Sequence, residues 1–124
     1  MEPKQELTVA KDSFPVVCIG MSAGAVEPIR TLFRLISPNT GMAFVIAHHL
    51  RNVRSLLPQI LLACTPMPVH EASVHQEILP NQVYIIPSGD EIRITDGFFS
   101  VRRRSKLYGW ANVFTLLLNS LAQS

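Results

Sequence analysis

The chain has 124 residues, of which 48% are hydrophobic and 16% are charged, and its formal net charge at pH 7 is +2. This length allows one domain with a buried core, and this composition excludes a disordered chain. No apolar run reaches the roughly 18 residues that a membrane-spanning helix needs, so we expect no membrane insertion. Residues 1–14 carry charged side chains and lack the uninterrupted apolar stretch of a secretory signal. We therefore expect a short flexible tail over 1–14 and a folded domain over 15–124.

Cysteine spacing and the distribution of basic residues narrow the range of functions. Cys18 lies inside an apolar run and Cys64 lies near the end of a predicted helix, and their spacing suggests neither a metal clip nor a disulfide framework. A reducing cytoplasm is therefore the expected location. The basic cluster from Arg102 to Lys106 is local and has no interleaved aromatic side chains, so we do not expect nucleic-acid binding.

The first half of the domain alternates between strand and helix patterns. Residues 15–19 are apolar on both faces, which predicts a central strand of a parallel sheet that ends at Gly20. Apolar side chains at helical spacing over 29–36 predict a helix, and residues 42–47 predict a second strand. A strand, a helix of crossover length and a second strand form a right-handed unit with parallel strands.

The second half of the domain contains shorter elements. Leu57, Ile60 and Leu61 predict a second amphipathic helix that Ser55 can cap. Short strands are expected over 68–74, 82–86, 91–95 and 98–101. The dipeptide Asp96-Gly97 between the last two strands is a strong hairpin signal, so part of this region is expected to be antiparallel.

A third amphipathic helix is predicted over 113–121, and its apolar face suggests self-association. Together the elements indicate an α/β fold. We expect a doubly wound, Rossmann-like and mostly parallel sheet with helices on both faces and a small antiparallel hairpin. The third helix would ordinarily pack against a further strand and helix, so the fold is expected to be incomplete at the C-terminus.

The turn after the first strand carries a serine between two glycines. A serine hydroxyl acts as a nucleophile when a base lies within hydrogen-bond reach and when donors stabilise the oxyanion that forms. Gly20 and Gly24 leave room for a tight turn around Ser22, and the amide of Ala23 lies where a helix begins, which favours negative charge. The alternative is that Ser22 only caps this helix.

Two histidines follow the second strand. Since the carboxyl ends of neighbouring parallel strands meet at one edge of a sheet, His48 and His49 are expected near Ser22. A dinucleotide-binding turn is disfavoured, because Ser22 replaces its middle glycine and histidines replace its acidic residue. A metal site that includes His70 and His75 is also disfavoured, because their spacing matches no familiar ligand motif. We expect neither a metal nor another cofactor.

Several segments together resemble one known family. They lie, in order, at residues 19–24, 41–50, 56–61, 67–69 and 79–87. These segments are similar to the catalytic domain of the chemotaxis protein-glutamate methylesterases, CheB. The match is specific because it runs nearly from end to end of the domain and depends on no single motif.

The resemblance implies a doubly wound α/β domain that hydrolyses glutamyl methyl esters, and deamidates glutamines, on the cytoplasmic helices of chemoreceptors. Ser22 matches the family's nucleophile and His49 matches its base, with His48 as the alternative. The family's aspartate lies in a glycine-rich segment beyond residue 124, and Asp90 is the best substitute within the chain. In a serine protease, replacing such an aspartate lowers turnover by up to about 10⁴-fold, so we expect this chain to be weakly active or inactive.

The sequence also departs from the family pattern near the nucleophile. Ala23 stands where threonine is frequent, and Gly24-Ala25 stands where two glycines are common. The short tail before the domain is similar to the start of family members that are fused to a methyltransferase, so we expect the leading piece of such a fusion or a truncated domain. The competing hypothesis is a non-catalytic interaction module of the same fold.

Overall fold

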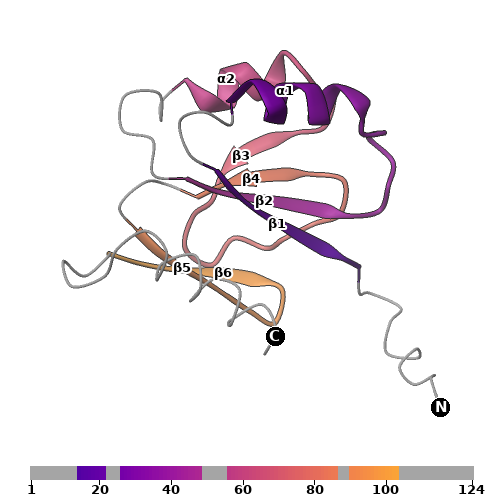
Figure 1. Cartoon of the computed structure of the whole chain (residues 1–124). Coiled ribbons are helices and arrows are strands. Elements are labelled where there is room, and N and C mark those ends of the chain that lie inside the picture. Colours follow the sequence, from indigo (N-terminus) through magenta and orange to yellow (C-terminus); the bar gives the residue numbers. More distant parts are fainter. Residues whose placement is uncertain (1–13, 22–25, 49–55, 87–89, 104–124) are drawn as a thin grey trace.

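The computed structural model describes residues 14–21, 26–48, 56–86 and 90–103. The helix predicted over 113–121 and most of the predicted tail lie outside these residues. Figure 1 shows the described elements in chain order: β1 (Val16–Met21), α1 (Val26–Leu35), β2 (Ala43–His48), α2 (Leu57–Leu62), β3 (Val69–Glu71), β4 (Val83–Ile85), β5 (Asp90–Thr95) and β6 (Phe98–Arg103).

The strands form one parallel sheet and one antiparallel pair. The larger sheet has the order β1-β2-β4-β3, and each neighbouring pair in it is parallel. Strands β5 and β6 pair antiparallel across Asp96 and Gly97, whose φ angles are 52° and 83°. Positive φ at both central residues is characteristic of the type I′ turn, a common two-residue hairpin connection. The structure thus confirms the α/β fold class and the predicted hairpin.

The first strand differs from its prediction in length and in position. Gly20 does not end β1, because Gly20 and Met21 continue the parallel ladder opposite Ala47 and His48. Within the described sheet β1 is an end strand and is only partly buried, whereas β2 lies between β1 and β4 and is buried along its whole length. The apolar run over 15–19 therefore predicted a strand correctly but not its place in the described sheet.

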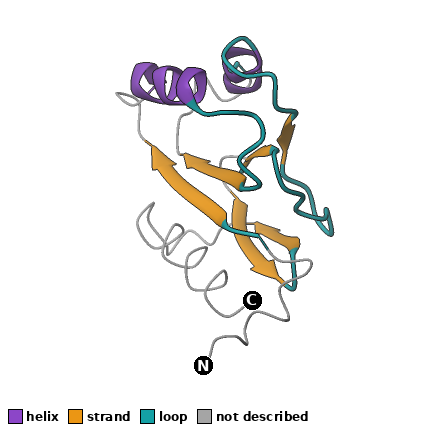
Figure 2. Cartoon of the chain, turned by 90° about the vertical axis from the view of Figure 1, so that its right-hand side faces the viewer, coloured by secondary structure: helices purple, strands orange, loops and turns teal. Residues whose placement is uncertain are grey.

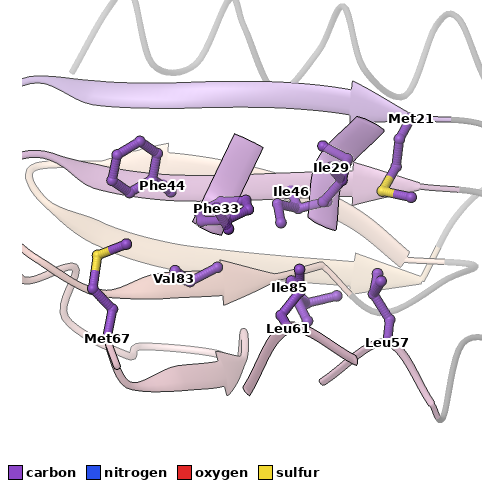
Figure 3. Close-up of a cluster of buried hydrophobic side chains, with 10 residues drawn as sticks. All are labelled: Met21, Ile29, Phe33, Phe44, Ile46, Leu57, Leu61, Met67, Val83 and Ile85. Carbon is purple, nitrogen blue, oxygen red and sulfur yellow. The ribbon is translucent and has the colours of Figure 1, made fainter. Parts of the chain in front are cut away.

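The two faces of the parallel sheet are covered by different elements. Helices α1 and α2 lie on one face, and the β5–β6 hairpin lies on the other, as Figures 1 and 2 show. The helical side encloses a core of apolar side chains, drawn in Figure 3: Met21, Ile29, Phe33, Phe44, Ile46, Leu57, Leu61, Met67, Val83 and Ile85. The hairpin side encloses a second core, made of Ala43, Val45, Ala47, Ala72, Ile78, Tyr84, Ile86, Ile94 and Phe99. Residues of β2 alternate between the two cores, as the period of a strand requires.

The second helix begins without a side-chain cap. Its N-cap residue is Leu56, which makes no capping hydrogen bond through its side chain, and Pro58 occupies the first turn. Proline suits this position because the first amides of a helix have no intrahelical partner. Ser55, the predicted cap, lies outside the described residues.

Candidate active site

The predicted site lies where β1 and β2 end. The two strands are in parallel register over six pairs, the last of which joins Met21 to His48. Neighbouring strands lie about 4.8 Å apart, so the chain leaves the sheet at two adjacent points. Ser22 directly follows Met21, and His49 directly follows His48. Ser22, Ala23, Gly24 and His49 themselves lie outside the described residues, and their roles stay predictions.

The alternative base, His48, is described and is withdrawn from solvent. It is the last residue of β2 and only 3% of its surface is exposed. Phe44 and Ile46 belong to the core on the helical side, so the alternation of the strand puts His48 on that same face. From the sequence alone, His48 is the second candidate base. The signal for its burial was present in the pattern of alternate residues along β2.

Gly20 lies within strand β1 in the described structure. It is the fifth residue of β1, faces Ala47 across the ladder and is exposed. Its φ lies outside the left-handed region. Among the described glycines, Gly41 and Gly97 adopt that conformation. A left-handed conformation therefore does not explain glycine at position 20.

The start of α1 brings helix amides close to this edge along the chain. The helix begins at Val26, five residues after the end of β1. The first amides of a helix have no intrahelical acceptor and carry partial positive charge, which favours an anion nearby. Glu27 lies in this first turn, but its carboxylate is 3.1 Å from the guanidinium of Arg30 and is partly neutralised by it.

The thiol of Cys18 is not a competing nucleophile at neutral pH. Burial in β1 raises the pKa of Cys18 to about 11, so the thiol keeps its proton. Cys64 donates a hydrogen bond from Sγ to the carbonyl of Ile60 at 3.2 Å. Neither cysteine forms a disulfide bond.

Asp90, the substitute acid, opens the hairpin. It is the first residue of β5, where its backbone lies opposite Arg103. In the chain it comes four residues after Ile86, whose amide donates to the carbonyl of Ile46 in β2 at 2.9 Å. A role for Asp90 in orienting a histidine stays a prediction.

The other histidines have separate surroundings. His70 in β3 forms a hydrogen bond through Nε2 to Oε1 of Gln82 at 2.5 Å and stacks on Tyr84 with ring centroids 5.2 Å apart. His75 lies exposed in the loop between β3 and β4 with φ of 65°. Among the residues that the structure describes, no three His, Cys, Asp or Glu side chains are grouped closely enough to hold a metal ion. No helix in the described part of the chain combines the length and apolar character needed to cross a membrane.

The chain is similar to known proteins over most of its length. The family model for the CheB methylesterase matches residues 17–124. A protein-glutamate methylesterase/protein-glutamine glutaminase of Syntrophotalea carbinolica is 26% identical over 100 residues, which cover 79% of this chain and 28% of that protein. The crystal structure of the Thermotoga maritima CheB methylesterase catalytic domain matches with a TM-score of 0.77 and 22% identity, over 90% of this chain and 61% of that one. The chain thus spans less than two thirds of both relatives, and the structural match shows a shared fold.

Proposed function

The chain belongs to the CheB methylesterase family, and on that premise we propose that it is part of a serine hydrolase that demethylates glutamyl methyl esters and deamidates glutamines. The name of the relative from Syntrophotalea carbinolica supports both activities. The observation that carries the proposal is the register of β1 with β2, in which the residues that precede Ser22 and His49 are direct partners. We propose the cytoplasmic helices of chemoreceptors as the substrate.

In the proposed reaction Ser22 is the nucleophile and His49 is the general base. The Oγ atom of Ser22 attacks the ester carbonyl while His49 accepts its proton, and the amides of Ala23 and of the first turn of α1 stabilise the oxyanion. The carbon–oxygen bond to the methoxy group then breaks, and His49 returns the proton so that methanol leaves. Water, deprotonated by His49, hydrolyses the acyl-enzyme and releases glutamate and free Ser22.

The burial of His48 supports His49 as the base. A general base must come within hydrogen-bond reach of the serine hydroxyl while a substrate occupies the same space. His48 is integrated into β2 and buried on the helical side of the sheet. We propose that an acid outside residues 1–124 orients His49, with Asp90 as the substitute within the chain.

Methanol release from a receptor-derived helical peptide that carries a glutamyl methyl ester tests the proposal. We expect Ser22→Ala to abolish the release above background and His49→Gln to lower its rate by about 10²–10⁴-fold, the usual contribution of a general base. Ser37→Ala is the matched serine control, since Ser37 lies just beyond the far end of α1 and its Oγ accepts the amide of Asn39 at 3.2 Å. His75→Asn is the matched histidine control, because asparagine tolerates the positive φ at that position.

The two control variants should release methanol at the wild-type rate. Equal rates in wild type and Ser22→Ala would show that Ser22 is not the nucleophile. A rate that falls with His48→Gln but not with His49→Gln would transfer the role of base to His48. The absence of hydrolysis and of deamidation by a longer protein that also contains the orienting acid would favour the non-catalytic interaction module.

A further inference from the structure

We propose that His48 is a positioning residue, which fixes the strand ends from which the nucleophile and the base leave the sheet. The inference rests on the proposed function. Apart from the phenol of Tyr84, the buried polar side chains of the described residues are His48 and Thr65. Of these two, His48 is the one that adjoins the predicted site.

The location of His48 connects it to both halves of the site. It forms the last register pair of β1 and β2 with Met21, and the next residues of the two strands are His49 and Ser22. Residues paired across a parallel ladder share one face of the sheet, so His48 and Met21 both face the helical side.

The core on the helical side, at the end of the sheet where β1 and β2 stop, includes residues of the two helices that follow Ser22 and His49 in the chain. Met21 packs in one cluster with Ile29 of α1, the helix that follows Ser22, and with Leu57 of α2, the helix that follows His49. Figure 3 shows Met21 at the arrowhead end of its strand, with Leu57 at the same end of the core. A side chain buried on this face at the end of β2 is therefore placed to set the geometry of both chain exits.

The chemistry of this position also points to function. Histidine is less often fully buried than leucine, isoleucine or phenylalanine, so its presence at this position is a departure from the usual composition of a core. Sequences depart from such local preferences chiefly at functional or strained sites. A displacement of about 1 Å at a catalytic group lowers the rate by up to about 10²-fold, so a residue that fixes the exit of His49 has a large effect on turnover.

The rate of Ser22 modification by a fluorophosphonate, measured from pH 5 to pH 9, tests the inference. In this step Oγ of Ser22 bonds to phosphorus, the phosphorus–fluorine bond breaks, fluoride leaves and the base takes the hydroxyl proton. We expect His48→Leu to lower the plateau rate at least tenfold and to flatten the rise with pH that a histidine base produces. His48→Gln, which keeps a polar side chain, should stay within about threefold of wild type with the same midpoint.

The matched control is Thr65→Val, which alters the other buried polar side chain. The Oγ1 atom of Thr65 accepts the amide of Met67 at 3.1 Å, and Figure 3 shows Met67 at the opposite end of the core from Met21. We expect this variant to lower the melting temperature without changing the modification rate or its pH profile. It separates a loss of stability from a loss of positioning.

Different results overturn different claims. If folded His48→Leu reacts as fast as wild type, or if Thr65→Val slows the reaction equally, His48 is structural only and the proposed function stands. If His48→Leu does not fold, His48→Met takes its place, because methionine adapts to irregular space. If the protein is not modified even when the orienting acid is present, or is modified equally after Ser22→Ala, the proposed function is wrong and the inference falls with it.

Discussion

Replacing Tyr84 by phenylalanine removes one hydroxyl group from the core on the hairpin side while leaving the aromatic ring in place. Tyr84 lies in β4 and only 1% of its surface is exposed. Its hydroxyl accepts a hydrogen bond from the backbone amide of Leu79 at 2.9 Å and donates one to the carbonyl of Glu77 at 3.3 Å. Its ring stacks on His70 and meets Phe99 edge-on, with centroids 5.3 Å apart in the second pair. The substitution therefore isolates two hydrogen bonds that hold the loop before β4.

The expected loss of stability follows from these two bonds. A net contribution of about 1 kcal/mol for the shorter bond and about 0.5 kcal/mol for the longer one gives about 1.5 kcal/mol. The amide of Leu79 loses its acceptor in a partly buried place, which raises the total to about 1.5–2.5 kcal/mol. Tyr84→Leu should cost a further 1–3 kcal/mol or so, because it also removes two aromatic contacts.

Urea unfolding followed by circular dichroism measures these differences in the free energy of unfolding. Because burial raises the pKa of Tyr84 above its ordinary value of 10.0, the folded state holds the phenolic proton more tightly than the unfolded state. The free energy of unfolding should therefore fall as the pH rises from about 10 towards the raised pKa, and this part of the fall should vanish in Tyr84→Phe. A loss below about 0.5 kcal/mol at pH 7, or equal losses for phenylalanine and leucine, would refute the reasoning.

Three further changes test other parts of the fold. Because burial raises the pKa of Cys18 to about 11, iodoacetamide should alkylate this thiol slowly at pH 9 in the native state. The free energy of unfolding should also fall between pH 9 and 11. Half-maximal alkylation near pH 9 would contradict the raised pKa. Asn81 has a φ of 62°, and its Oδ1 accepts a hydrogen bond from the backbone amide of Gly41 at 2.7 Å. Asn81→Ala should therefore lower the free energy of unfolding by about 1–3 kcal/mol in urea unfolding. Asn81→Asp keeps the acceptor and should lower it less. Met21→Ala should cost about 2–5 kcal/mol, and Met21→Leu less than about 1.5 kcal/mol, because Met21 is buried in the core on the helical side; equal losses would contradict that packing.

Local patterns in the sequence predicted the elements that frame the site. The apolar run at 42–47 became β2 with a shift of one residue, and Asp96-Gly97 formed the expected hairpin turn. These predictions succeed because strand burial and turn geometry depend on neighbouring residues. The parallel pairing of β1 with β2 was also predicted and is confirmed.

Long-range pairing was harder to predict. The sequence gives no local sign that β4 inserts between β2 and β3, or that β1 is an end strand of the described sheet. Strand order depends on contacts between distant segments, which periodicity does not encode. The continuation of β1 through Gly20 was missed for the same reason, because it depends on pairing with Ala47.

The residues of the candidate site stay predictions, and the structure describes the strand ends that precede them. The turn around Ser22 and the pair His48-His49 indicated a serine and a base at one edge, and the described strand ends are adjacent there. Of the two histidines, the structure describes only His48, which is buried. The acid partner stays a prediction, because the resemblance places it beyond residue 124 and the substitute within the chain, Asp90, carries no spacing signal of its own.

Peptide mapping by mass spectrometry after treatment with a fluorophosphonate tests the central claim most directly. We expect one phosphonyl adduct, on the peptide that contains Ser22, with slower labelling in His49→Gln and no adduct in Ser22→Ala. Labelling of wild type at another serine, or labelling that persists in Ser22→Ala, would contradict the assignment of the strand ends at Met21 and His48 as the frame of the catalytic site.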